Sequence, residues 1–424
     1  MSKIFVFKFG GASVKDAASI QNLRNILHNR LRNPTVIVVS AMGKTTNALE
    51  EILGLKLAGA DFSLKSTTLK NYHLGICAGL FDKEHRVFSV VENYFSQLER
   101  FLHKKLSKEN YDEYYDQVVS FGELISSRIV QEYLCESGIF CVWQDAREVV
   151  MTNEDYRFAK IHWEKTAQLC QKILRPILEQ YPIVTQGFIG SEPGGKTTTL
   201  GREGSDFTAA ILASGLKAAS VTIWKDVDGV LNADPKRFPN TVKFDELDYR
   251  EAAELTYYGA SVIHPKTIKP LANMGIPLFV KSFIHPEGSG TKIHQVDRAN
   301  TVPCIVVKDS QILVSFKVTD FTFINEAHIH QVYSELERLK LRVNLLQTSA
   351  ISISIVIDKE LFKLEKLIAA LTKDFEIRYN EGLQLITVKN HQPEIMAELV
   401  AGKEVLLEQI TRTTFQIVVK PSAN

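Results

Sequence analysis

The sequence predicts an α/β protein with a central, mostly parallel sheet, helices on both of its faces, and a C-terminal region of ferredoxin-like form. At residues 4–40 an apolar strand, two glycines, a helix and a second apolar strand follow one another, which is a βαβ beginning. At residues 314–379 the pattern reads βαββαβ, the order of a ferredoxin-like unit. A chain of 424 residues exceeds one ordinary core, so two or three domains are expected.

The other elements are predicted from apolar spacing and from the glycines that end each run. Residues 48–128 have a helical pattern whose apolar stripe we assign to packing, and a further helix is predicted to begin near residues 120–123. Short buried strands are predicted at residues 140–144, 183–189, 221–224 and 277–282. The end of the chain is predicted to form a strand, a helix and a strand at residues 383–388, 394–409 and 413–419. This last fragment therefore lacks a hairpin strand and a final helix of a second ferredoxin-like unit.

Composition excludes several classes of function. The formal net charge is +1, so no basic field indicates nucleic acid or an anionic membrane as a partner. No apolar run reaches the length of a membrane span, and Met1 leads directly into a strand without a signal-peptide cleavage region. The five cysteines are spread out, which favours free thiols in a reducing compartment. We expect a cytoplasmic protein that binds neither nucleic acid nor membrane.

The stretch Thr197-Thr-Thr-Leu-Gly-Arg-Glu-Gly-Ser-Asp206 carries the strongest functional signal. Its three threonines disfavour helix, its glycines allow unusual backbone conformations, and Ser205 or Asp206 is expected to be the N-cap of the helix that follows. A strand, a glycine-rich loop and a helix start direct N–H groups and a positive helix end toward an anion. Arg202 adds a fork-shaped cation for carboxylate or phosphate. The alternative is an ordinary loop between a strand and a helix.

A second glycine-rich stretch matches the P-loop pattern by letters alone. Gly190-Ser-Glu-Pro-Gly-Gly-Lys-Thr197 fits G-x-x-x-x-G-K-[ST]. A P-loop requires a helix that begins at its Lys-Thr pair, whereas here the predicted helix begins only near Ser205. We therefore interpret the match as accidental.

Further functional groups follow the predicted strands, where α/β sheets bind their ligands. Lys8 stands beside two glycines, and a buried lysine is costly unless it meets an anion or reaches solvent from an edge strand. Residues 40–47 form a polar turn, and Glu123 either binds a ligand or serves a helix dipole. Asp226 and Asp228 suit a magnesium ion beside phosphates. Together these groups indicate phosphoryl transfer, in which catalysis is mostly positioning and charge neutralisation.

Six motifs, in this order, resemble those of the aspartate kinases of the amino acid kinase superfamily along nearly the whole chain. They are Lys8-Phe-Gly-Gly-Ala-Ser-Val14, Ser120-Phe-Gly-Glu-Leu124, Gln186-Gly-Phe-Ile-Gly190, Thr197 to Asp206, Trp224-Lys-Asp-Val-Asp-Gly229 and Tyr258-Gly-Ala-Ser-Val-Ile-His-Pro265. The resemblance implies transfer of the γ-phosphate of ATP to the β-carboxylate of L-aspartate, giving 4-phospho-L-aspartate, the first step toward lysine, threonine and methionine.

The resemblance also implies a division into domains. The catalytic amino acid kinase domain would occupy residues 1–295 and a regulatory region residues 302–424. That region would hold two ACT units, one inserted into the other: a complete one at about 311–380, and an abbreviated one made of 302–310 and 381–424. A homodimer through this region is expected.

For the substrate, the resemblance implies that Thr46, Glu123, Arg202 and Ser205 bind aspartate. Arg202 suits the α-carboxylate, because its planar fork binds carboxylates bidentately. Glu123 suits the ammonium group, and Ser205 would lie close to the reacting carboxylate.

For catalysis, the resemblance implies roles for Lys8 and Asp206. Lys8 would hold the transferring phosphates beside Gly10 and Gly11, and Asp206 would orient Lys8. The nucleophile is already an ionised carboxylate, so no general base is expected. Mg²⁺ is the expected cofactor, held mainly by the phosphates of ATP rather than by a protein metal site.

For the nucleotide, the resemblance implies contacts from Asp226, Leu231, Lys236 and Ser261. Three of these depart from the family pattern, which often has Tyr, Arg and Lys where Leu231, Lys236 and Ser261 stand. The lysine usual at the last position binds phosphate, and Lys266 is a possible substitute for it.

Regulation is where the chain departs further. In lysine-sensitive relatives, acids stand at the positions of Asn344 and Ala350, so weak or absent feedback by lysine is expected here. Two alternatives to an active kinase remain open at the level of sequence. One is a catalytically weakened, amino-acid-binding regulatory subunit of the same family, and the other is a P-loop NTPase that depends on Lys196.

Overall fold

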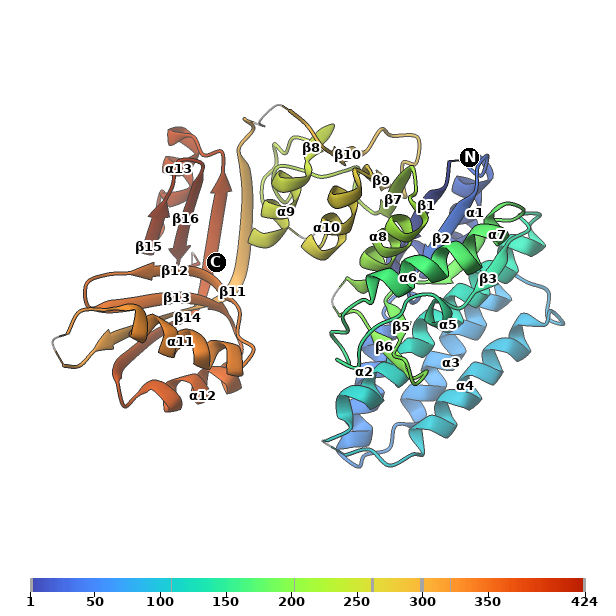
Figure 1. The fold of residues 1–424 in the computed structure, drawn as a ribbon, viewed down its shortest axis with the longest axis horizontal. Coiled ribbons are helices and arrows are strands. Elements are labelled where there is room, and N and C mark those ends of the chain that lie inside the picture. The colour runs from blue at the N-terminus through green and yellow to red at the C-terminus, as the bar shows by residue number, and fades with distance from the viewer. Residues whose placement is uncertain are drawn as a thin grey trace. The chain divides into compact units, whose positions relative to one another are not determined.

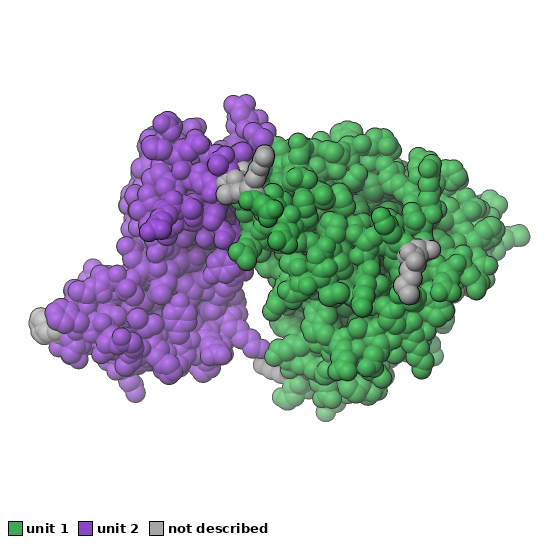
Figure 2. Space-filling model, turned by 45° about the horizontal axis from the view of Figure 1, so that its top comes forward, with its two compact units in different colours: residues 1–230, 243–253, 262–297 green, residues 231–242, 254–261, 298–424 purple. Residues whose placement is uncertain are grey.

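The computed structural model describes residues 3–107, 109–201, 203–260, 263–297, 301–320 and 322–421. The chain forms two compact units, coloured separately in Figure 2. Unit 1 comprises residues 1–230, 243–253 and 262–297, and unit 2 comprises residues 231–242, 254–261 and 298–424. Two short segments from the middle of the chain therefore cluster with the C-terminal region.

Unit 1 is built on an eight-stranded sheet with the order β3-β4-β2-β1-β7-β9-β10-β8 (Figure 1). Neighbouring strands are parallel except for β9 and β10, which pair antiparallel. Strand β1 lies in the interior of the sheet, because β2 and β7 pair with its two edges. The strands are β1 (Phe5–Phe9), β2 (Thr35–Val39), β3 (Val142–Gln144), β4 (Ile183–Gln186), β7 (Ser220–Lys225), β8 (Glu246–Asp248), β9 (Leu278–Ser282) and β10 (Thr291–His294).

Helices cover both faces of this sheet, which confirms the predicted fold class. Phe7 and Phe9 of β1 pack into the core formed with the helices between α1 and α5, whereas α8 and α10 belong to the opposite face. No helix in the described ranges is long and apolar enough to cross a membrane. The helices are α1 (Ala17–His28), α2 (Thr45–Leu57), α3 (Ser63–Ala78), α4 (Val87–Leu102), α5 (Tyr111–Glu136), α6 (Trp163–Leu169), α7 (Arg175–Leu178), α8 (Gly204–Leu216), α9 (Tyr249–Tyr258) and α10 (Pro265–Met274).

Two details of unit 1 differ from the sequence-based expectation. The helix predicted to begin near residues 120–123 begins at Tyr111, so Glu123 lies in the middle of α5. The strand predicted at 183–189 is divided, because β4 ends at Gln186 and a separate hairpin of β5 (Ile189–Ser191) and β6 (Thr197–Thr199) follows.

Unit 2 contains a six-stranded antiparallel sheet with the order β12-β13-β11-β14-β16-β15. Its first half has the predicted βαββαβ order. The long strands β11 and β14 continue into the second half, with register shifts near Ser310, whose φ is +55°. The elements are β11 (Cys304–Val318), α11 (Glu326–Arg338), β12 (Val343–Thr348), β13 (Ser352–Asp358), α12 (Leu361–Leu371), β14 (Phe375–Lys389), α13 (Pro393–Val400), β15 (Val405–Ile410) and β16 (Thr414–Val419).

Alternating side chains on β11 place this sheet between two apolar layers. Val314 and Phe316 pack with α11 and α12 on one face, whereas Leu313 joins Leu345 and Leu383 in a separate cluster. Successive side chains of a strand point to opposite faces of a sheet, so these two clusters lie on opposite faces of this one.

The prediction of a helix at residues 394–409 is wrong in its second half. Helix α13 ends at Val400, Gly402 has φ +70°, and residues 405–410 form the strand β15, which pairs with β16. The second ferredoxin-like unit therefore contains the hairpin strand that the sequence was predicted to lack. A final helix does not follow β16 within the described residues, which end at position 421.

Candidate active site

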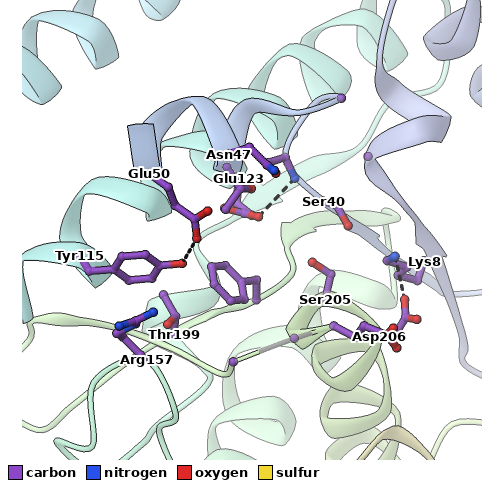
Figure 3. Close-up of a pocket in the computed structure, with 18 of the residues that line it drawn as sticks. Lys8, Ser40, Asn47, Glu50, Tyr115, Glu123, Arg157, Thr199, Ser205 and Asp206 are labelled. Atoms are coloured by element: carbon purple, nitrogen blue, oxygen red, sulfur yellow. Dashed lines mark hydrogen bonds and ion pairs between the residues drawn. The ribbon is translucent and has the colours of Figure 1, made fainter. Parts of the chain in front are cut away.

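A cavity of about 600 Å³ lies in unit 1, at the carboxyl ends of β1, β2 and β7. Six of the residues predicted to act on substrate or phosphate line it: Lys8, Gly11, Thr46, Glu123, Ser205 and Asp206. Figure 3 shows Lys8 and Asp206 at one end of the view, Glu50, Tyr115 and Arg157 at the other, and Glu123 between them. Parallel strands that end at one edge, as here, bring distant parts of the sequence together.

At one end of the cavity a buried carboxylate meets two lysines. Lys8 Nζ lies 2.7 Å from Asp206 Oδ1, and Lys225 Nζ lies 3.3 Å from Asp206 Oδ2. Burial alone would raise the pKa of Asp206, but the two neighbouring charges outweigh it and hold the pKa below its ordinary value. Asp206 is therefore an anion that fixes two cations at the wall of the cavity.

In the centre of the cavity, Glu123 contributes a buried carboxyl group. Its side chain is only 3% exposed, and burial raises its pKa to about 8. The backbone N–H of Ala41 donates to Oε1 at 3.3 Å, whereas Oε2 has no hydrogen-bond partner among the described residues. A buried carboxyl oxygen without a partner is costly, so a cationic ligand group would stabilise it.

The glycine-rich loop leads into the cavity with left-handed backbone. Gly201 and Glu203 have φ of +79° and +55°, and Glu203 is the residue before α8. Ser205 and Asp206 therefore lie in the first helical turn, and the expectation that one of them is the N-cap is wrong. The helix start nevertheless lines the cavity, and its dipole favours an anion there. Arg202 lies outside the described residues.

The opposite end of the cavity is held together by Asp116, which the sequence analysis missed. This fully buried carboxylate of α5 accepts hydrogen bonds from the backbone N–H groups of Arg157 at 2.9 Å and Thr199 at 2.8 Å, and from the Thr199 hydroxyl at 2.7 Å. The Arg157 guanidinium lies 4.5 Å from the ring centroid of Tyr115, whose hydroxyl donates to Glu50. Asp116 thus fastens a loop and the strand β6 beside the cavity.

The sequence pattern of the amino acid kinase family matches residues 3–282 of this chain. The chain belongs to the amino acid kinase family. This confirms the resemblance found in the six motifs.

Named relatives within the family are aspartokinases. Lysine-sensitive aspartokinase 3 of Escherichia coli (strain K12) is 30% identical over 419 residues, which cover 96% of this chain and 90% of that protein. Aspartokinase 1, chloroplastic, of Arabidopsis thaliana is 32% identical over 364 residues, which cover 83% of this chain and 63% of that protein. The present chain thus spans less than two thirds of the plant protein.

Solved aspartokinase structures superimpose closely on this amino acid kinase. Escherichia coli aspartokinase III in complex with aspartate and ADP matches with a TM-score of 0.85 at 27% identity, over 99% of this chain and 96% of that chain. The same enzyme in complex with lysine and aspartate matches with a TM-score of 0.82 at 27% identity, over 98% of this chain and 96% of that chain.

Most of the residues predicted to bind the nucleotide do not line the cavity, in contrast to the residues predicted to bind aspartate. A Cβ added to Gly10 would lie 3.2 Å from Lys8 Nζ, so Gly10 leaves room for that ammonium group. Asp226 directly follows β7 but is exposed and does not line the cavity. Leu231 and Lys236 belong to unit 2, and Ser261 lies outside the described residues.

The structure also describes Lys266, the possible substitute for a phosphate-binding lysine at position 261, and Lys196, the lysine of the P-loop alternative. Lys266 lies in the first turn of α10, is exposed and does not line the cavity. Lys196 pairs with Glu113 at 2.9 Å, and the residues after it form β6 rather than a helix. The mechanism of a P-loop requires a helix there, so the structure supports the interpretation of that match as accidental.

The described residues contain no group of three or more His, Cys, Asp or Glu side chains arranged to hold a metal ion. The buried carboxylate nearest to Lys8, that of Asp206, is already paired with two lysines. A divalent cation that enters with a nucleotide fits this arrangement, because its ligands would come from phosphate oxygens and water.

Proposed function

We propose that this chain is an aspartate kinase, which transfers the γ-phosphate of ATP to the β-carboxylate of L-aspartate. The observation that carries the proposal is the pairing, in one cavity, of an unsatisfied buried carboxyl group with a lysine-rich end. Aspartate has an ammonium group for the first and a reacting carboxylate for the second. The aspartokinase relatives, one of them bound to aspartate and ADP, support this assignment.

In this mechanism Glu123 binds the substrate ammonium group, and Thr46 and Ser205 line the space beside it. Arg202 is proposed to bind the α-carboxylate through its planar fork. In this binding mode the β-carboxylate would reach the end of the cavity where Lys8 and Asp206 lie. Positioning of this kind accounts for much of the catalysis in phosphoryl transfer.

The chemical step needs no base. An oxygen of the β-carboxylate attacks the γ-phosphorus, the bond from that phosphorus to the β–γ bridging oxygen breaks, and its electron pair leaves with ADP. The product is 4-phospho-L-aspartate. Lys8 stabilises the charge on the phosphoryl oxygens, and Asp206 holds Lys8 in place. Mg²⁺ bound to the phosphates of ATP supplies further charge neutralisation.

We further propose that Asp226, Leu231, Lys236 and Ser261 contact the nucleotide. The same proposal includes a homodimer formed through residues 302–424 and a location in the cytoplasm. Residues 1–295 would carry catalysis and residues 302–424 regulation.

A substrate panel tests the proposed function. The purified chain is given Mg-ATP with aspartate, glutamate, N-acetylglutamate or carbamate, and ADP formation is followed. We expect ADP formation with aspartate, and a rate at least tenfold lower with the other acceptors. Tight aspartate binding without ADP formation would instead identify the chain as a regulatory subunit.

A further inference from the structure

A second cavity, of about 830 Å³, lies on the face of the sheet opposite Lys8. Successive side chains of a strand alternate between the two faces, so Phe5 and Phe7 of β1 point away from the side of Lys8. The cavity extends over β1, β7 and β9 and is bounded by the segment 29–33, which follows the end of α1 at His28. All of its described lining residues belong to unit 1, and none of them lines the cavity around Lys8.

The floor of this second cavity combines aromatic rings with hydroxyl groups. Residues directly opposite each other on paired strands share a face, and Phe7 lies opposite Thr222, which in turn lies opposite Phe279. In the next row on the same face, Trp224 lies opposite Lys281. The pairing of the strands therefore places a lysine at the border of an aromatic floor. The floor consists of Phe5, Phe7, Trp224, Phe279, Ser220 and Thr222.

Arg30 is a fixed cation at the wall of this cavity. Its guanidinium group donates to the carbonyls of Ile26 at 3.2 Å and Pro286 at 2.8 Å, and to Glu287 Oε1 at 2.9 Å. Its Cζ lies 5.3 Å from the ring centroid of Trp224. These bonds use three of the five guanidinium N–H groups, so two are left for a ligand in the described structure.

Lys281 is the second cation of the wall, and its side chain is partly buried. Its ammonium group has no hydrogen bond or ion pair with a described residue. Burial lowers the pKa of Lys281, and the nearby charge of Arg30 lowers it further, whereas Glu287 opposes this only in part. A partly buried ammonium group beside another cation destabilises the folded chain unless an anion approaches it.

The ionised side chains that line the cavity leave it positive. Arg30, Arg32 and Lys281 face the single carboxylate of Glu287. Glu287 is 82% exposed, so water screens its pairing with Arg30. Two uncompensated positive charges match a dianion such as a phosphate monoester, and guanidinium groups bind phosphate well. The aromatic floor favours a ligand that also has an apolar part.

We propose that this cavity binds a small phosphate monoester, whose phosphate group contacts Arg30 and Lys281 and whose apolar part lies on Phe5 and Phe279. The volume of the cavity is in the range of natural small-molecule sites. The site is independent of the proposed function, because its residues are separate from those that line the cavity around Lys8.

Phenyl phosphate is a suitable probe, because it joins a dianion to an aromatic ring. It is titrated into the full chain by ligand-observed NMR, with saturating Mg-ADP and aspartate present to fill the site around Lys8. We expect a Kd of about 1 mM or lower, and binding about tenfold weaker for inorganic phosphate, which lacks the ring, and for benzoate, which carries only one charge. Lack of phenyl phosphate binding, or equal binding of either comparison compound, would overturn the proposal.

Two lysine variants locate the bound probe. Lys281→Met removes one of the two phosphate contacts and should weaken phenyl phosphate by about tenfold. Lys269→Met is the matched control, because it removes the same charge from an exposed position on α10, on the other face of the sheet. It should keep the Kd within about twofold of the wild type. Equal affinity of the wild type and Lys281→Met would overturn the proposal, and Lys281→Gln replaces Lys281→Met if that variant does not fold.

A third variant separates this site from the one around Lys8. Lys8→Ala, titrated without ADP or aspartate, should still bind phenyl phosphate, so the test does not require the proposed function to hold. Loss of binding in Lys8→Ala with retention in Lys281→Met would place the probe at the other site and overturn the proposal. Self-association of the chain that Lys281→Met abolishes would identify a second copy as the occupant and would also overturn it. If the wild type forms no ADP with aspartate, the proposed function fails and this site still stands.

Discussion

Glu123 is the side chain whose protonation state is expected to change when the proposed substrate binds. Burial in the middle of α5 raises its pKa to about 8, so the empty site holds a neutral acid at pH 7. A bound ammonium group favours the ionised form, because an opposite charge within a few ångströms stabilises a carboxylate. The proposed binding of the substrate ammonium group to Glu123 therefore couples aspartate binding to loss of a proton.

This coupling gives the first prediction. At pH 7 a group with a pKa of about 8 is roughly nine-tenths protonated, so aspartate binding should release roughly 0.9 proton per site. Since the proton must leave, affinity should weaken about tenfold as pH falls from 7 to 6 and become nearly constant above pH 8. Calorimetry in two buffers of different ionisation enthalpy measures the release.

The control for this prediction is Glu123→Gln, which has no proton to lose. It should bind aspartate weakly and show no dependence of the heat on the buffer. Equal heats in both buffers for the wild type, at pH 7, would show that Glu123 does not titrate on binding.

Sequence predicted the residues of the site whose local signal is strong. Lys8 beside two glycines, and Ser205 and Asp206 at a helix start, were found because their backbone context is unusual for their residue type. Lys225 was missed although, like Lys8, it lies at the carboxyl-terminal end of a strand, because the next glycine, Gly229, is four residues away, whereas Gly10 is only two residues after Lys8. Asp116 had no signal of its own, because its partners Arg157 and Thr199 are distant in sequence.

At the scale of elements, the start of α8 must approach the turn after β4 closely. A Cβ added to Gly187 would lie 2.4 Å from the Ser205 Cβ, closer than real Cβ contacts. Gly187 is therefore required for Ser205 and Asp206 to reach the cavity.

The second prediction concerns this contact. Gly187→Ala should displace the first turn of α8, lower the free energy of unfolding by about 1–3 kcal/mol and reduce kcat severely. Gly75→Ala is the matched control, since nothing lies within 4 Å of its added Cβ and it lies inside α3. That variant should be neutral or more stable by up to about 1 kcal/mol. Urea unfolding and kinetics check both, and a fully active, stable Gly187→Ala would contradict the packing described.

The third prediction concerns β12. The Asn344 side chain is buried and already satisfied: its Oδ1 accepts from Lys308 at 2.8 Å, and its Nδ2 donates to Gln311 at 2.8 Å and to Asp358 at 3.0 Å. It has neither a charge nor a spare donor for an amino-acid effector. Each lost charged contact weakens binding by roughly 1.5–3 kcal/mol, so we predict flat activity with lysine up to millimolar concentrations. Half-inhibition by sub-millimolar lysine at saturating aspartate would refute this.

The C-terminal elements show why some strands were mistaken for helix. Residues 394–400 and 405–410 are both apolar enough to extend one helical pattern, and Gly402 between them gives the only local break. Pairing of β15 with β16 decides the second segment, and such pairing is not visible in local periodicity. Glu123 was likewise placed at a helix start, because Gly122 before it suggested a break that α5 tolerates.

At the scale of the whole molecule, the two compact units are not divided by a single cut in the chain. Segments 231–242 and 254–261 belong to unit 2. Within that unit the Asn232 amide donates to the carbonyl of Pro303 at 3.0 Å, and Glu254 pairs with Lys389 at 2.5 Å. A sequence pattern gives the order of the elements, but it does not show that segments inside the sequence of unit 1 pack with the C-terminal region.

The fourth prediction concerns the contacts of segments 231–242 and 254–261 within unit 2. A fragment of residues 1–297 keeps both segments but removes their partners, so it should unfold at a lower temperature than the full chain and aggregate more readily. In the full chain, Asn232→Ala should lower the free energy of unfolding by about 1–3 kcal/mol, since it leaves the Pro303 carbonyl without this donor. Thermal unfolding by calorimetry measures both. A fragment as stable as the full chain would show that these contacts contribute little.

Trapping of the reaction product tests whether phosphate passes to aspartate in the cavity that contains Lys8. Hydroxylamine traps an acyl phosphate as a hydroxamate, which is quantified after reaction with Mg-ATP and aspartate. We predict hydroxamate formation by the wild type, a loss of at least about 100-fold in Lys8→Ala, and a rate within about twofold of the wild type in Lys196→Ala. Loss of the product in Lys196→Ala with retention in Lys8→Ala would contradict this assignment and place the chemistry at the glycine-rich stretch before β6.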